Sequence, residues 1–230
     1  MASFAEQVIS FCDELEYKGS LPEGISIMNP FKNNPEIIPA ISQFYNKFYN
    51  DNSLRYLIMG INPGRFGAGV TGIPFTDSKR LKENCGLSIP GLNTFETSSV
   101  FIYEMIDAYG GPEKFYSKFY ISSVSPLGFT TENLNGKNVN YNYYDSNKLT
   151  EAVIDFIIES INKQLDFGIY RDICFCLGTG RNYRFLLRLN AEHRLFHKIV
   201  PLEHPRYIMQ YKSKQKHLYI KKYLENLYRI

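Results

Sequence analysis

Apolar residues recur along this chain with two different periods, and these periods predict its secondary structure. Apolar side chains that return every three or four residues are typical of helices with one buried face, whereas short continuous apolar runs are typical of buried strands. The helical pattern predicts helices at residues 4–17, 35–49, 78–85, 99–109, 146–165, 181–189 and 208–228, with a further short helix ending at 118.

Apolar runs predict four strands, at residues 54–60, 119–124, 172–177 and 198–202. At least one predicted helix separates each strand from the next, so we expect the strands to be parallel and covered by helices. The fold class predicted is therefore α/β, a three-layer α/β/α sandwich around a mainly parallel, roughly four-stranded sheet. Residues 21–30 and 130–145 lack a helical period and are predicted as loops, the second long and at the surface.

The length of the chain predicts a single domain over residues 1–230. Its 18 Tyr and 17 Phe suit a dense core, and they also suit the stacking of nucleic-acid bases. A net charge of +3 is too small by itself to indicate a nucleic-acid partner. The charge is unevenly distributed, however, because residues 206–229 carry seven Lys and Arg against one Glu. This segment predicts a basic surface near the C-terminus.

The four cysteines have neither zinc nor cluster spacing, so we expect reduced core thiols, no metal and no cofactor. The N-terminal segment is acidic and amphipathic and does not resemble a signal peptide. No apolar run is long enough to span a membrane. We therefore expect a cytoplasmic protein that has no membrane partner and is a monomer.

The strand predicted at residues 54–60 leads directly into a glycine-rich loop, INPGRFGAGVTGIPF, which is the strongest candidate for chemistry. In open α/β sheets, ligands bind beyond the carboxyl ends of the strands. Gly67, Gly69 and Gly72 also match a dinucleotide-binding fingerprint, but that motif needs glycines directly after the strand and a helix beneath them. Asn62-Pro63 precedes the triplet here, and no amphipathic run follows it, so a nucleotide-dependent oxidoreductase is a less favoured alternative.

This loop, with the glycine before it, resembles the first motif of the single-strand-selective monofunctional uracil-DNA glycosylases. Three more stretches resemble motifs of the uracil-DNA glycosylase superfamily: SPLGF at 125–129, LGTGR at 177–181 and VPLEHP at 200–205. The resemblance implies a monofunctional, metal-free DNA glycosylase of base excision repair. Such an enzyme flips uracil, a 5-substituted uracil or another deaminated base such as xanthine out of DNA and hydrolyses its N-glycosidic bond.

The resemblance also implies roles for individual residues. Asn62 matches the Asn that helps to position the attacking water. His204 matches the His that donates a hydrogen bond to the negative charge developing on the departing base. Phe75 matches the aromatic residue that stacks on the flipped base, and Gly64 matches the small residue beside the C5 atom of the pyrimidine.

Base recognition departs from the family pattern at Ser123, where the family carries an Asn that makes paired hydrogen bonds to uracil. A hydroxyl cannot reproduce this bidentate contact, so we expect recognition to be weaker, to come from elsewhere, or to extend to other deaminated bases. Asn140 and Asn142 are candidates in the polar segment. The backbone amides around Ile61 and Phe66 are candidate donors to the base oxygens.

DNA is the expected partner, single- or double-stranded and carrying a damaged base. The loop after the His-Pro motif makes Arg206 and Tyr207 candidates for the wedge that holds the base flipped out. Lys212, Lys214 and Arg181 are candidate phosphate contacts, which would make binding fall with salt.

A non-catalytic DNA- or nucleotide-binding protein of the same fold is the main alternative. Two substitutions motivate it, because Asn62 is a weaker base than a carboxylate and Ser123 replaces the family's Asn. Loss of excision in an Asn62→Ala or His204→Ala variant that still binds DNA would favour the enzyme.

Overall fold

Four parallel strands form the central sheet. In the computed structural model, which describes residues 2–230, these are β2 (Arg55–Gly60), β3 (Phe119–Ser123), β6 (Ile169–Leu177) and β7 (Lys198–Leu202), in the order β3-β2-β6-β7. All three pairings are parallel, so the strands end at the same edge of the sheet. The predicted four-stranded parallel sheet is confirmed, although β6 begins three residues earlier than expected.

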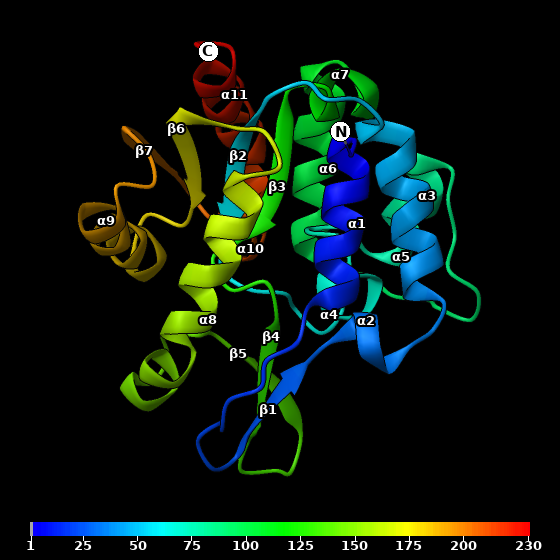
Figure 1. Cartoon of the computed structure of the whole chain (residues 1–230). Helices are drawn as coiled ribbons and strands as arrows, with labels where there is room; N and C mark the ends of the chain where they lie inside the picture. Colours follow the sequence, from blue (N-terminus) through cyan, green and yellow to red (C-terminus); the bar gives the residue numbers. More distant parts are fainter. Residues whose placement is uncertain (1) are drawn as a thin grey trace.

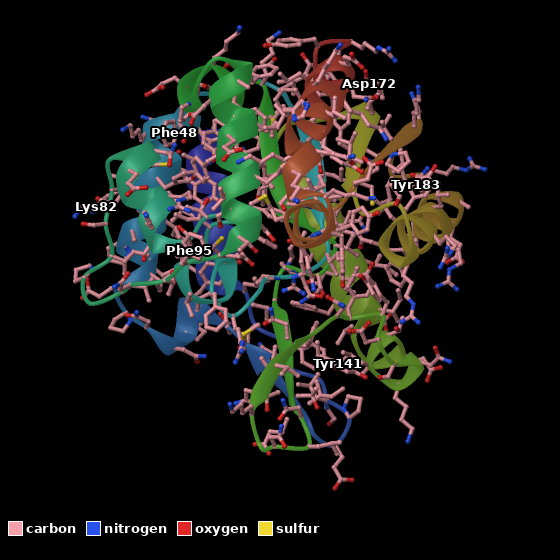
Figure 2. All side chains as sticks on the ribbon, turned by 180° about the vertical axis from the view of Figure 1, so that it is seen from behind. Phe48, Lys82, Phe95, Tyr141, Asp172 and Tyr183 are labelled. Atoms are coloured by element: carbon pink, nitrogen blue, oxygen red, sulfur yellow. The ribbon has the colours of Figure 1, made fainter. Side chains whose placement is uncertain are left out.

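Helices cover both faces of this sheet. α1 (Phe4–Glu14), α3 (Ile37–Tyr49) and α8 (Asn147–Leu165) lie on the side nearer the viewer in Figure 1. α6 (Thr97–Tyr109) and α11 (Lys216–Leu227) lie on the other side, which Figure 2 shows from behind. The three-layer α/β/α prediction is therefore confirmed. Five further helices are α2 (Pro30–Asn33), α4 (Ala68–Thr71), α5 (Ser78–Cys85), α7 (Pro112–Tyr116) and α9 (Arg181–His193).

Local sequence explains where several helices begin. Ser3 caps α1 through a capping box: its hydroxyl accepts from the backbone N–H of Glu6, and the Glu6 carboxylate accepts from the backbone N–H of Ser3. The Ser146 hydroxyl caps α8 in a similar way. Each cap satisfies backbone donors that a helix start otherwise leaves unpaired.

A second sheet occupies the two segments predicted as loops at 21–30 and 130–145, so those predictions are wrong. β1 (Ile25–Met28), β4 (Gly128–Glu132) and β5 (Asn138–Tyr141) form an antiparallel sheet in the order β1-β4-β5. It lies beneath the carboxyl edge of the central sheet in Figure 1. The polar strands β4 and β5 escaped detection because their side chains lack a clear apolar alternation.

The β4–β5 turn nevertheless carries a recognisable signal. Asn135-Gly136 is a dipeptide that favours tight hairpins, and Gly136 adopts a φ of 69°. The Asn133 carboxamide oxygen closes the turn by accepting from the backbone N–H groups of Asn135 and Lys137. This dipeptide would have predicted the hairpin.

The single C-terminal helix predicted at residues 208–228 is also wrong. The chain forms α10 (Pro205–Tyr211), a short 3₁₀ turn η1 (Ser213–Gln215) and then α11. Lys212 breaks the helix, because its φ of −131° and ψ of 19° are not helical. No helix within residues 2–230 is long and apolar enough to cross a membrane.

Candidate active site

A cavity of about 240 Å³ opens where β2, β3 and β7 end. Its wall also includes residues of β5, the residue before α6 and the first turn of α10. Ten of the residues predicted from the sequence line it together: Ile61, Asn62, Gly64, Phe75, Ser123, Asn140, Asn142, His204, Arg206 and Tyr207.

Four other predicted residues are not part of this wall. Phe66 is 50% exposed, and the base-binding role expected of its backbone amide stays a prediction. Arg181 begins α9, and its guanidinium lies 3.7 Å from the carboxylate of Asp145. Lys212 and Lys214 follow α10 and form no ion pair with any residue from 2 to 230. Their ammonium groups are therefore available to other anions.

The Asn62 carboxamide is held in one orientation by the backbone. Its Oδ1 accepts from the N–H of Tyr143 at 3.2 Å, and its Nδ2 donates to the carbonyl oxygens of Tyr141 at 3.2 Å and Pro63 at 3.4 Å. Both amide hydrogens are thus used, and one lone pair of Oδ1 is left. The side chain ties the end of β2 to the segment between β5 and α8, and it can hold a water only as an acceptor.

His204 is a neutral donor with a fixed tautomer. It precedes α10, and its Nδ1 accepts from the backbone N–H of Arg206 at 3.1 Å. The neutral ring therefore carries its proton on Nε2. Burial, and secondarily the charge of Arg206, lower the pKa of His204 from 6.5 to about 3. At neutral pH the imidazole donates through Nε2 without being charged.

Phe75 supplies an aromatic wall beside this imidazole. The two ring centroids are 5.7 Å apart and the planes are inclined by 50°. Phe75 has a φ of 51°, which is uncommon for a residue other than glycine and is typical of functional sites. The ring also lies against Gly60, where an added Cβ would be 2.8 Å from a ring carbon. Glycine at the end of β2 therefore gives this ring its place.

The three polar candidates for base recognition differ in burial and in the hydrogen bonds that their side chains already make. Ser123 is buried at the end of β3. Asn142 donates from Nδ2 to the carboxylate of Asp145 at 2.9 Å, so its amide is engaged. Asn140 accepts at Oδ1 from the backbone N–H of Arg65 at 3.0 Å. The Nδ2 of Asn140 has no hydrogen-bond partner among residues 2–230, and Asn140 lines the cavity.

The cavity also contains a carboxyl group that sequence reasoning missed. Glu96 is the one acidic residue among the described residues that line the cavity. Burial raises the pKa of Glu96 from 4.5 to about 7. The charge of Arg206 and a 3.4 Å hydrogen bond from the Ser99 hydroxyl lower this pKa, whereas the charge of Asp77 raises it further. Glu96 lies outside the family motifs, and no periodic pattern marks it.

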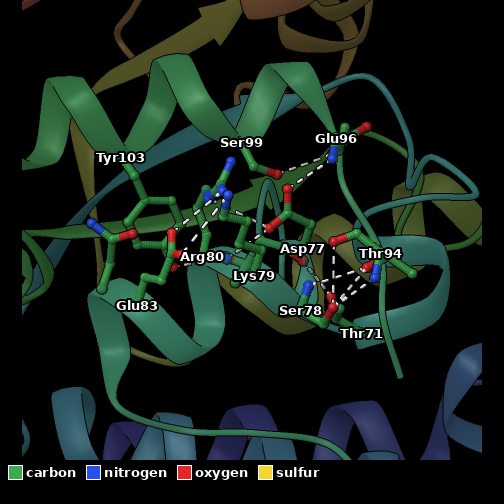
Figure 3. A network of polar contacts seen from close by, with 12 residues as sticks. Thr71, Asp77, Ser78, Lys79, Arg80, Glu83, Thr94, Glu96, Ser99 and Tyr103 are labelled. Atoms are coloured by element: carbon green, nitrogen blue, oxygen red, sulfur yellow. Dashed lines mark hydrogen bonds and ion pairs between the residues drawn. The ribbon is translucent and has the colours of Figure 1, made fainter. Parts of the chain in front are cut away.

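A buried network fixes the backbone of Glu96 (Figure 3). Asp77 is fully buried, and its carboxylate accepts from the backbone N–H of Arg80 at 2.7 Å and from that of Glu96 at 2.7 Å. Ser78 ties the same loop by accepting from the backbone N–H of Thr94 at 2.7 Å. The network joins the start of α5 to the start of α6 and so determines where the Glu96 carboxyl group lies.

Comparison with known proteins agrees with this geometry. A family model for the uracil DNA glycosylase superfamily matches residues 46–228. The chain belongs to that superfamily. The chain shares 56% sequence identity with wild-type SMUG2 from Pedobacter heparinus. The crystal structure of that protein superimposes on this one with a TM-score of 0.97, and the match covers 100% of this chain and 98% of that one. No curated protein matches the chain. Membership supports an enzyme of the uracil-DNA glycosylase type that acts on DNA.

In this uracil DNA glycosylase superfamily member, a second hollow adjoins the cavity along the β6–α9 loop. Its wall includes Gly180 and Arg181, together with His204 and Tyr207 of the first site. Arg181 therefore lies on the surface next to the His-Pro loop. The motifs at residues 177–181 and 200–205, which are separate in sequence, meet here.

Proposed function

We propose that this protein is a monofunctional DNA glycosylase that excises uracil from DNA by base flipping, and that its substrates include 5-substituted uracils or xanthine. The observation that carries the proposal is the neutral imidazole of His204, whose free Nε2–H lies in a cavity beside the aromatic ring of Phe75. This pairing of a stacking surface with a fixed donor suits a base that departs with negative charge.

The reaction is the hydrolysis of the bond between the base and C1′ of the sugar. The flipped base stacks on Phe75, and His204 donates to the base oxygen as the bonding electrons move onto the base. The remaining lone pair of Asn62 holds the water that attacks C1′. The backbone amides of Ile61 and Phe66 add donors to the same base. The proton that the water loses ends on the departing base. The products are the free base and an abasic site, with the strand left intact.

The residues around the cavity mouth suit a DNA strand. Arg206 and Tyr207 are exposed at the start of α10 and line the cavity, which is where a wedge would enter the base stack. Arg181, Lys212 and Lys214 provide cations for phosphates on either side. The contacts are independent of base sequence, so specificity comes from the cavity.

One observation favours the alternative of a non-catalytic binding protein. The Asn62 amide is bonded to three backbone groups and cannot accept a proton, so it gives the water no general base. In the proposed enzyme, stabilisation of the departing base by His204 therefore has to supply more of the rate.

The test is incubation with end-labelled single-stranded and duplex oligonucleotides that carry one uracil or xanthine, followed by hot alkali. Strand breaks that need the alkali step, and that disappear in Asn62→Ala and His204→Ala, are expected. His193→Ala, an exposed histidine at the end of α9, is the matched control and should remain active. Intact substrate in every context, together with retained DNA binding, would establish the binding protein instead.

A further inference from the structure

Two polar groups flank the α carbon of Gly64 inside the cavity. A Cβ added to Gly64 would lie 2.9 Å from Oε1 of Glu96 and 3.5 Å from Nδ2 of Asn140. Neither atom has a hydrogen-bond partner among residues 2–230, because the bonds of these side chains are made by Oε2 of Glu96 and Oδ1 of Asn140. A carboxyl oxygen and an amide N–H are therefore both available near the α carbon of Gly64, on residues that line the cavity.

Glycines in the loop after β2 make room for this carboxyl group. A side chain at Gly67 would overlap Oε2 of Glu96, and one at Gly64 would crowd Oε1. The Glu96 backbone is held from the opposite side by Asp77. The loop and the buried network thus place the carboxyl group in the wall of the cavity.

We infer that Glu96 and Asn140 recognise the hydrogen-bonding edge of the flipped base, a task for which the short hydroxyl of Ser123 is insufficient. This inference rests on the proposed function. A protonated carboxyl group can donate from Oε1 to a C=O of the base, as the NH2 group of a carboxamide can. The Asn140 N–H is a second donor, so the two side chains together complement the two C=O groups that flank an N–H on uracil and on xanthine.

The protonation state of Glu96 determines whether this works. Its pKa is about 7, with Arg206 lowering it and Asp77 raising it; His204, which lies on the same cavity wall, is neutral at this pH. Negative charge develops on the departing base, so an ionised Glu96 repels it and a protonated Glu96 stabilises it. Recognition should weaken as the pH rises through 7.

The experiment is single-turnover excision of uracil from a single-stranded oligonucleotide between pH 6 and 8.5, for the wild type, Glu96→Gln, Glu96→Ala and Asn140→Ala. Each Ala variant should raise the half-saturating enzyme concentration at pH 6 by about tenfold, the effect of one lost hydrogen bond to a neutral group. The wild-type value should rise by about tenfold toward pH 8.5. Glu96→Gln should stay within a few-fold of the wild type at pH 6 and show no such rise.

Glu83→Gln is the matched control, because Glu83 is an exposed acid of α5 that pairs with the Arg80 guanidinium, makes no bond to Glu96 and does not line the cavity (Figure 3). It should keep the wild-type profile, and thermal unfolding should show that every variant is folded. If Glu96→Gln is as impaired as Glu96→Ala, or if Glu96→Ala leaves the profile unchanged, the inference is wrong while the proposed function stands. If the wild type excises neither uracil nor xanthine, both fail.

Discussion

The ring of Phe75 lies 5.7 Å from the imidazole of His204, although the two residues follow different strands of the sheet. Phe75 comes from the loop after β2, and His204 comes directly after β7. A base stacked on Phe75 would therefore have one edge next to the Nε2–H of His204. In the proposed enzyme, stacking and hydrogen bonding would thus act on the same base from adjoining walls.

Removal of the Phe75 ring should weaken excision strongly. Stacking of a base on an aromatic side chain contributes about 1–3 kcal/mol, so Phe75→Ala should lower kcat/KM on uracil DNA by about 10- to 100-fold. Phe95→Ala is the control, because Phe95 is 53% exposed and lies outside the cavity. Equal activity of the two variants would show that Phe75 does not stack on substrate. Gly60→Ala should share the Phe75→Ala defect, because the added methyl group would displace the ring.

Asn62→Asp should destabilise the fold. The carboxylate would face the carbonyl oxygens of Tyr141 and Pro63, which now accept from the amide, and two acceptors cannot pair. We expect the free energy of unfolding, measured with urea, to fall by about 1–3 kcal/mol. Asn226→Asp removes an exposed hydrogen bond from the side-chain amide to the Lys222 carbonyl oxygen, and it should change the free energy of unfolding much less. An Asn62→Asp protein as stable as the wild type would mean that these bonds are weak.

The lowered pKa of His204 should appear as a pH-dependent stability difference. The folded state binds a proton only below about pH 3, whereas the unfolded histidine binds one below about 6.5. The unfolded state therefore holds more protons between these values, and stability falls as the pH decreases from 6.5. His204→Gln does not lose stability in this way. The difference in midpoint temperature between this variant and the wild type should therefore shift in favour of the variant when the pH is lowered from 7 to 5. A constant difference would contradict a neutral buried imidazole.

Glu96 should act in the opposite direction. Its folded pKa of about 7 exceeds the ordinary value of 4.5, so the folded state holds more protons between these pH values and loses stability as the pH rises through them. Glu96→Gln should gain stability relative to the wild type from pH 4.5 to pH 8, by at most about 3 kcal/mol. Urea unfolding at both pH values measures this gain, and Glu83→Gln should show none.

Lys212 and Lys214 should contribute to DNA binding through charge alone. Each phosphate contact that is removed should make the plot of log affinity against log salt less steep by about 0.7–0.9, whatever the DNA sequence. Fluorescence anisotropy at several salt concentrations with Lys212→Ala and Lys214→Ala would measure this. Lys82→Ala, an exposed lysine on α5 that Figure 2 labels, should leave the slope unchanged. An equal effect of all three variants would indicate a response to net charge rather than to a site.

The central sheet was predictable because its strands are continuous apolar runs such as LRYLIMG, and burial on both faces imposes that composition. The hairpin of β4 and β5 was not predicted from periodicity, since polar pairs such as Glu132 with Asn138 belong to a sheet that is partly open to solvent. The break at Lys212 is a backbone conformation without a glycine or proline to mark it. The residues around Lys212 therefore give no sequence signal for this helix break.

Ten predicted residues converge on one cavity, most of them because the family motifs lie at strand ends, which parallel topology brings together. Glu96 lies before a helix and outside every motif, so only the three-dimensional arrangement with Gly64 and Asp77 identifies it. The environment of Asn62 was equally hidden, since its partners are backbone groups of residues near 141 and 143.

The hydrogen bond from the Arg206 amide to Nδ1 of His204 is also the first cap of α10. The imidazole is therefore fixed to the start of the helix that carries Arg206 and Tyr207. In the proposed enzyme, a DNA strand that shifted α10 would also shift the imidazole. Contact with the DNA backbone and alignment of the proton donor would thereby be coupled.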